Sequence, residues 1–310
     1  REASDLLVYQ VLPSRYGMNP DDLRRADAIE IVVGQGAKPG GGGMLLGLKM
    51  NERVATMRAL PEDIDQRSAC RHPDWTGPDD LAIKITELRE ITDWEKPIYI
   101  KIGASRTYYD TMLSIKAGAD AIVLDGMQGG TAATQDVFIE HAGIPTLPAV
   151  RQAVEALQEM DMHRTVRLIV SGGIRSGADV AKALALGADA VSIGTAALIA
   201  LNCNAPIHVE DYRALGTEPG SCHHCHTGQC PVGVATQEPR LEARLDVDTA
   251  TRRVRNYLST LALEAQTLAR ACGKSHLLNL EPEDLVALTV EAAAMAGVPL
   301  AGTDWIPGKS

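Results

Sequence analysis

The feature that most constrains the fold is a repeated alternation of short β-branched runs with longer helical patterns. Six runs are present, at Ala28–Val33, Ile98–Ile102, Ala121–Leu124, Ile144–Leu147, Val166–Val170 and Ala190–Ile193. Helical patterns lie between them, at Asp79–Thr92, Tyr108–Ala117, Ala149–Met160 and Ala178–Leu186. This alternation is typical of βα units that build a parallel sheet. We expect Ser176 to cap the last of these helices and Gly187 to end it.

The number of runs raises the question of closure. The 310 residues suffice for one (β/α)8 TIM barrel of about 250 residues with an added segment. Six runs leave either an open sheet or a barrel whose first two βα units precede residue 1, and we favour the second because Arg1 falls inside a helical pattern over Ala3–Gln10. The expected parts are barrel strands three to eight at 1–200, a cysteine-rich loop at 201–240 and a helical extension at 241–310, with helices at Thr249–Ala271 and Glu283–Ala296.

Composition excludes several classes of function. The formal net charge is −10, so nucleic acid is not expected as a partner. No run of about 18 apolar residues and no signal peptide is visible, which predicts a cytoplasmic protein without a membrane partner.

Glycines gather where the predicted strands end. They occur in Gly34–Gly43, Gly126–Gly130 before Thr131, Ser171–Gly173, and Gly194 before Thr195. In (β/α)8 barrels a phosphate is often held by the loops after strands seven and eight, where glycine lets backbone N–H groups come close. The segments after the last two predicted strands therefore predict a phosphate site. The alternative is that these glycines only form tight turns.

Lys101 ends the predicted strand Ile98–Ile102, so its ammonium points into the mouth of the barrel. An unpaired ammonium is costly to bury, but the cost is offset where it stabilises an anionic reduced flavin. The alternative is an ion pair with Asp125.

Cys222, Cys225 and Cys230, with Pro231 after the last of them, are the most specific feature of the chain. Three such thiolates favour an iron–sulfur cluster of the [3Fe-4S] type. Zinc is the alternative, because His223, His224 or His226 could complete a Cys3His site. The remaining cysteines, Cys70, Cys203 and Cys272, are expected to be buried thiols.

Together these residues resemble the FMN and iron–sulfur domain of the glutamate synthase family. The most specific matches are Gln35–Gly40 and Cys230–Gln237, and Gln10 and Ser14–Gly17 match the segment before the third strand. The resemblance implies FMN as cofactor and Lys38 and Arg58 as ligands of the carboxylates of 2-oxoglutarate or glutamate, with Lys38 and Lys101 as catalytic residues. The implied FMN contacts are Gln10, Arg15, Lys101, Gln128, Gly129, Gly130, Thr131, Ser171, Gly172, Gly173, Gly194 and Thr195.

Three departures from the family pattern resemble one branch of the family, the flavin subunit of N-methylglutamate synthase. Met44 replaces a glutamine that contacts substrate, Met127 and Gln128 replace a His-Asp pair, and the first two cluster cysteines are closer together. That branch implies formation of N-methylglutamate and ammonia from glutamate and methylamine. It also implies a hetero-oligomer with a glutaminase-like subunit and a β-helix subunit. Met44 would contact the N-methyl group.

Other functions remain open at this stage. An assimilatory glutamate synthase that reduces 2-iminoglutarate, made from 2-oxoglutarate and ammonia, would use the same cofactors. An enzyme similar to inosinate dehydrogenase shares the Gly-Gly-Ile of residues 172–174 but lacks the cysteine cluster. A scaffold subunit without catalysis is the non-enzyme alternative, against which the retained Lys38, Arg58 and Lys101 argue.

Overall fold

The computed structural model describes residues 3–38, 40–130 and 134–309. Its centre is a six-stranded, all-parallel sheet in the order β1 (Val8–Val11), β2 (Ala28–Val32), β5 (Ile98–Gly103), β6 (Ala121–Asp125), β7 (Arg167–Ser171) and β8 (Ala190–Val191). Every residue of β2 and β6 is buried, as expected for a parallel sheet covered on both faces. In the described part of the chain this sheet is open, with β1 and β8 at its edges.

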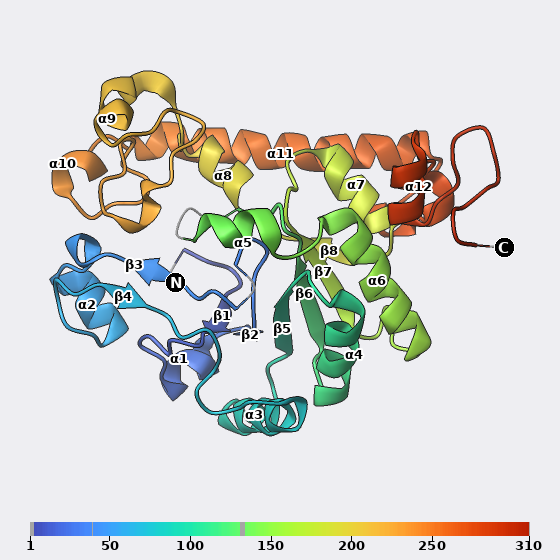
Figure 1. Cartoon of the computed structure of the whole chain (residues 1–310), viewed down its shortest axis with the longest axis horizontal. Helices are drawn as coiled ribbons and strands as arrows, with labels where there is room; N and C mark the ends of the chain where they lie inside the picture. The colour runs from blue at the N-terminus through green and yellow to red at the C-terminus, as the bar shows by residue number, and fades with distance from the viewer. Residues whose placement is uncertain (1–2, 39, 131–133, 310) are drawn as a thin grey trace.

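Helices follow most of the strands. The helices of the central part are α1 (Pro20–Arg25), α2 (Glu52–Arg58), α3 (Pro78–Ile91), α4 (Thr107–Ala117), α5 (Asp136–His141), α6 (Thr146–Glu159), α7 (Gly177–Ala185) and α8 (Thr195–Ala200). Those after them are α9 (Val209–Ala214), α10 (Pro239–Glu242), α11 (Val247–Ala271) and α12 (Val290–Ala296). Figure 1 shows α3, α4 and α6 in sequence along one side of the sheet and α11 lying across α7 and α8.

The predicted parallel α/β class is confirmed, but two segments were assigned wrongly. Ile144–Leu147 is not a strand, because Pro145 caps α6 and Thr146 begins it, so β6 pairs directly with β7. Residues 3–10 do not form a helix. Val8–Val11 instead pairs with Ala28–Ile31 of β2 as the first strand of the sheet.

Local signals were more accurate around α7. Ser176 caps this helix, and Asp179 completes a capping box by accepting from the Ser176 backbone N–H. Gly187 follows the helix with a φ of +114°, a conformation that favours glycine. The predicted helix Glu283–Ala296 is shorter than expected, since only Val290–Ala296 is α-helical.

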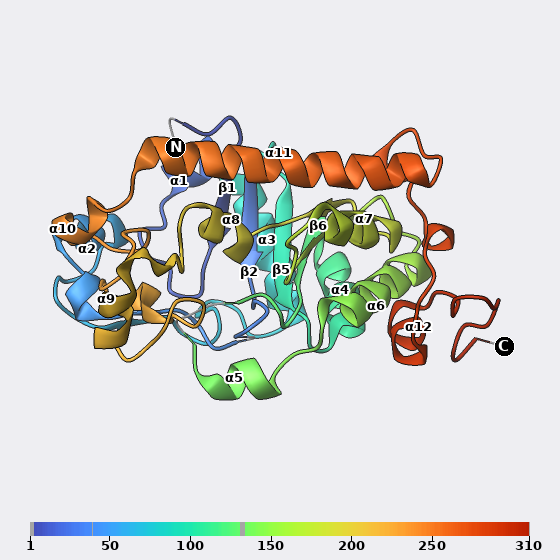
Figure 2. The same cartoon turned by 90° about the horizontal axis from the view of Figure 1, so that it is seen from above.

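The cysteine-rich segment folds back over the N-terminal part of the chain. Figure 1 and Figure 2 show α9 and α10 at the same end of the molecule as α2 and the small antiparallel sheet of β3 (Met44–Leu45) and β4 (Gln66–Arg67). The backbone N–H of Leu46 donates to the carbonyl of His226 at 3.0 Å, which joins the two segments. No helix among the described residues is long and apolar enough to span a membrane.

Candidate active site

A cavity of about 640 Å³ opens at the carboxyl ends of β5 to β8. Its walls hold nine of the predicted cofactor residues: Lys101, Gln128, Gly129, Gly130, Ser171, Gly172, Gly173, Gly194 and Thr195. Thr131, also predicted there, lies outside the described residues. The structure therefore gathers into one cavity residues that come from the ends of four different strands.

Gly172 is tightly enclosed at the base of this cavity. It has a φ of +101°, and an added Cβ would lie 2.7 Å from the carbonyl oxygen of Gly126. Gly194 differs, because an added Cβ would meet no atom of the described residues within 4 Å. Gly172 is thus needed for packing, as in the tight-turn alternative, whereas the open space at Gly194 fits a backbone that a ligand can approach closely.

Two basic side chains that the sequence analysis missed line the same cavity. Arg175 directly follows the Gly-Gly-Ile segment and precedes the capped N-terminus of α7, and Lys182 lies in the last turn of that helix. A cation beside a helix N-terminus suits a phosphate group. The sequence signal for Arg175 was the presence of a basic residue directly after the Gly-Gly-Ile segment.

Lys101 lies in the wall of the cavity, as predicted, and among the described residues it makes no ion pair with Asp125. Asp125 is engaged otherwise, since it accepts hydrogen bonds from Gly36 N at 2.7 Å and from the Ser171 hydroxyl. The charge of Lys101 acts instead on Glu30 of β2, which is buried. Desolvation raises the pKa of Glu30, and the charge of Lys101 partly opposes this. Sequence analysis did not identify Glu30.

A second cavity, of about 250 Å³, contains the predicted substrate ligands Lys38, Met44 and Arg58 together with Gln10. Lys38 is 9% exposed, and its ammonium has no partner among the described residues. Burial lowers the pKa of this lysine. Arg58 ends α2 and stacks over the ring of Tyr16 at 4.8 Å. An unpartnered buried cation beside an arginine is an arrangement suited to a carboxylate ligand.

Gln35 lines both cavities, so the two sites meet at this residue. The hydrogen bond from Gly36 N to Asp125 holds the segment that follows Gln35 against the end of β6. A ligand in the smaller cavity would therefore lie beside a ligand in the larger one. Gln35 carries no predicted role beyond the motif in which it stands.

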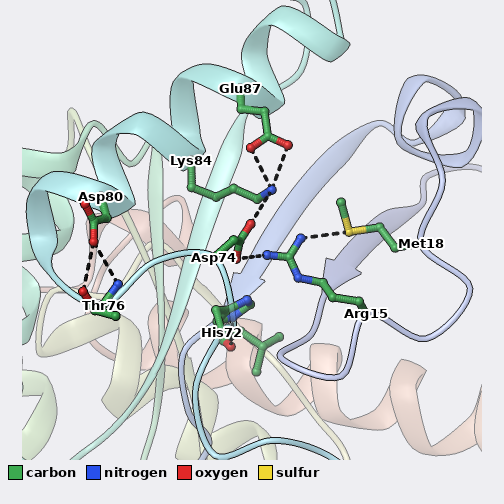
Figure 3. Close-up of polar contacts among 9 residues, drawn as sticks. Arg15, Met18, His72, Asp74, Thr76, Asp80, Lys84 and Glu87 are labelled. Carbon is green, nitrogen blue, oxygen red and sulfur yellow. Dashed lines mark hydrogen bonds and ion pairs between the residues drawn. The ribbon is translucent and has the colours of Figure 1, made fainter.

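Arg15 lies outside both cavities. Its guanidinium pairs with Asp74 and donates to the Met18 sulfur at 3.3 Å (Figure 3). Asp74 also pairs with Lys84 at 2.9 Å, and these partners hold the pKa of Asp74 at about 2 although desolvation acts in the opposite direction. The structure thus places Arg15 in a network that joins the β1–α1 loop to α3, and does not bring it to the predicted cofactor residues.

The three predicted metal ligands lie in one loop, with Cys230 buried and Cys222 and Cys225 half-buried. Burial raises the pKa of both half-buried thiols, and Lys49 opposes this at Cys225. Among the described residues, no three His, Cys, Asp or Glu side chains are arranged as a metal site.

Cys203 joins these thiols from the end of the segment after α8. Its pKa is raised to about 11 by burial and by the charges of Cys225, Cys230 and Cys222. Tyr212, which is 1% exposed, packs in the same small cluster as Cys230 and Cys222. Thiols are the donors that iron–sulfur clusters take, so the residue types gathered here fit such a cluster. The long separation between Cys203 and Cys222 hid Cys203 from the motif.

The expectation of buried thiols was wrong for two cysteines. Cys70 and Cys272 are both exposed. Cys70 is in a loop that lines the smaller cavity, and Cys272 is the C-cap residue directly after α11.

Comparisons with known proteins relate the chain to glutamate synthases. Residues 1–275 match the model of the conserved region in glutamate synthase. A glutamate synthase large subunit-like protein of Rhizobium meliloti is 72% identical over 309 residues, which cover 100% of this chain and 70% of that protein. An archaeal glutamate synthase [NADPH] of Methanocaldococcus jannaschii is 40% identical over 278 residues, covering 89% of this chain and 51% of the relative.

Among solved structures, a mutant flavocytochrome b2 with benzoylformate is similar, with a TM-score of 0.51 at 19% identity. The match covers 91% of this chain and 55% of that one. At this identity the likeness concerns the fold alone. The chain spans about half the length of the archaeal relative and of this structure.

Proposed function

The chain belongs to the glutamate synthase family, and from that premise we propose that it is the flavin-binding part of an N-methylglutamate synthase. The observation that carries the proposal is the meeting of two cavities at Gln35, one lined by glycines and Lys101, the other by Lys38, Met44 and Arg58. The reaction forms N-methylglutamate and ammonia from glutamate and methylamine.

The larger cavity suits FMN. The phosphate would lie between the β7–α7 turn, with Gly173 and Arg175, and the turn before α8, with Gly194 and Thr195. Lys101 would stand beside the ring and favour its reduced, anionic form. A bound FMN supplies reversible hydride acceptance from a substrate carbon.

The smaller cavity suits the glutamate skeleton. Lys38 and Arg58 would hold its two carboxylates, which would give the unpartnered ammonium of Lys38 its counter-ion. Met44 brings an apolar contact where a methyl group carried on nitrogen could lie. Because this cavity meets the larger one at Gln35, the α-carbon can face the cofactor.

The reaction then balances without an outside reductant. The α-carbon of glutamate loses a hydride and its nitrogen loses a proton, which gives 2-iminoglutarate. Methylamine adds to the imine carbon and ammonia leaves, forming the N-methyl imine. Return of the hydride to the same carbon and of the proton to nitrogen yields N-methylglutamate.

We further propose that the cysteine loop carries an iron–sulfur cluster. Cys222, Cys225 and Cys230 would hold a [3Fe-4S] cluster, with Cys203 as a fourth thiol beside them. The corresponding division is a flavin domain at 1–200, a cluster loop at 201–240 and a helical extension at 241–310. A glutaminase-like subunit and a β-helix subunit would complete the hetero-oligomer.

An assimilatory glutamate synthase is the second candidate, favoured by the names of the archaeal and archaeal-type relatives. The test is to incubate the anaerobic holoenzyme, with its co-purifying subunits, with glutamate and methylamine and no reductant. N-methylglutamate in the mass spectrum supports the proposal. Failure to form it, with glutamate made from 2-oxoglutarate, glutamine and reduced ferredoxin or NADPH, supports glutamate synthase instead.

A further inference from the structure

The cysteine loop lies directly against the segment that forms one wall of the smaller cavity. Besides the bond from Leu46 N to His226 O, the Lys49 ammonium donates to the carbonyl of Cys225 at 2.8 Å. Gly228 has a φ of +85°, and a Cβ there would be 3.3 Å from the carbonyl oxygen of Leu48. Two hydrogen bonds and the close approach of Gly228 to Leu48 thus hold the loop against residues 46–49.

The same segment sets the position of the substrate ligands. Met44 and Leu45 lie on one side of Lys49, and α2, which ends at Arg58, lies on the other. Leu45, Met50 and Ala55 form a small apolar core of their own, which packs β3, the turn after it and α2 against one another. A displacement of Lys49 would therefore also shift Met44 and Arg58.

Lys49 also stands between opposite electrostatic influences. Burial and the charge of Arg58 lower the pKa of Lys49, whereas negative charge on Cys225 or Cys230 acts in the opposite direction. The direct bond to Cys225 is to a carbonyl oxygen, which carries no titratable proton. A charged group held by the cysteine loop would therefore act on the Lys49 ammonium, which lies 2.8 Å from the carbonyl oxygen of Cys225.

We propose that Lys49 is a positioning residue that couples the cysteine loop to the substrate cavity, so that a cluster in the loop strengthens binding of the dicarboxylate. The proposal rests on the proposed function for the identity of both ligands. It gives a cluster a structural role in a reaction that is redox-neutral overall. By linkage, the substrate must stabilise the cluster to the same degree.

The test compares Lys49→Met with Lys49→Arg, and with Lys116→Met as the control, because Lys116 is exposed on α4. Binding of 2-oxoglutarate is followed by the flavin absorption of the holo protein, and the reduction potential of the cluster by electron paramagnetic resonance. We expect Lys49→Met to weaken binding roughly tenfold, the loss of about one charge-assisted hydrogen bond. We also expect the potential to become more negative, and Lys49→Arg to restore most of both.

A second pair of measurements separates coupling from general damage. Removal of the cluster with a chelator should weaken binding of 2-oxoglutarate in the wild type but not further in Lys49→Met. Gly228→Ala removes no thiol but adds a Cβ 3.3 Å from the Leu48 carbonyl oxygen at a φ of +85°, so it should weaken binding as Lys49→Met does.

Equal binding in wild type, Lys49→Met and Gly228→Ala would overturn the coupling. Iron-free wild-type protein would instead refute the cluster in the proposed function and with it the role of a cluster in strengthening binding. In that case weaker binding in Lys49→Met, restored by Lys49→Arg, would still support coupling between loop and cavity, and unchanged binding would refute it.

Discussion

Gln10 donates a hydrogen bond from its Nε2 to Oε1 of Glu30 at 2.6 Å, which links neighbouring strands β1 and β2. Glu30 in turn interacts with Lys101. This buried acid partly compensates the cation proposed to face the flavin. Glu30→Gln keeps the acceptor for Gln10 and removes the charge. We expect the flavin potential to become more positive by the equivalent of about 1 kcal/mol in redox titrations. An unchanged potential would contradict this role.

The same residue predicts a dependence of stability on pH. Desolvation raises the pKa of Glu30 above its ordinary value of 4.5, so the folded state binds this proton more tightly than the unfolded state does. The resulting stabilisation is complete below pH 4.5 and is lost as the pH rises through the folded value. The melting temperature of the wild type, relative to Glu30→Gln, should fall over that window. A constant difference would exclude the effect.

Lys38 is expected to favour substrate binding but to lower the stability of the fold. Its buried ammonium has no partner among the described residues, so Lys38→Met should raise the free energy of unfolding by roughly 1–3 kcal/mol. The same change should raise the KM for the dicarboxylate at least about tenfold, because a charge-assisted bond is lost. Chemical denaturation and steady-state kinetics check the two parts. A less stable variant with normal KM would refute the assignment.

Alanine substitutions at two glycines of the larger cavity are expected to have different effects, one on stability and the other on cofactor binding. Gly172→Ala places a Cβ 2.7 Å from the Gly126 oxygen at a φ of +101°, so we expect destabilisation by about 1–3 kcal/mol. In the part of the chain that the structure describes, the Cβ of Gly194→Ala meets no atom within 4 Å, so this variant should keep the melting temperature. Its flavin content should nevertheless fall if the phosphate approaches that backbone. Full flavin occupancy in Gly194→Ala would argue against a phosphate there.

Arg15 is expected to support the fold. Because Arg15→Met breaks the pair with Asp74, it should lower stability by up to about 1 kcal/mol, a value reduced by the partial exposure of the pair. Flavin content should be unaffected. Loss of flavin at unchanged stability would contradict this and would support the sequence-based prediction that Arg15 contacts the cofactor.

The sequence predicted the parallel sheet because its signal is local, and it named residues that line each cavity from strand-end glycines, from Lys101 and from the resemblance to the family. Strand-end glycines, Lys101 and the Gln35–Gly40 motif can be recognised without knowing what lies beside them. Val8–Val11 could not be recognised as a strand, since only pairing with β2 overrides its helical neighbourhood. Ile144 looked like the start of a strand, but Pro145 and Thr146 begin a helix.

Partners distant in the chain were also missed. Cys203 joins the other thiols from well before the motif, and Glu30 acquires its role from Lys101 on β5. Arg15 matched a family motif, yet its partner Asp74 lies 59 positions away. In each case the decisive contact is made by tertiary packing, which spacing along the chain does not encode.

The most direct test of the central claim is an anaerobic titration of the oxidised holoenzyme with glutamate alone, followed by absorption spectroscopy. Transfer of hydride between adjacent cavities predicts that the flavin bleaches, and that methylamine then restores the oxidised spectrum as N-methylglutamate forms. A flavin spectrum that glutamate leaves unchanged, in protein that binds glutamate, would contradict the account.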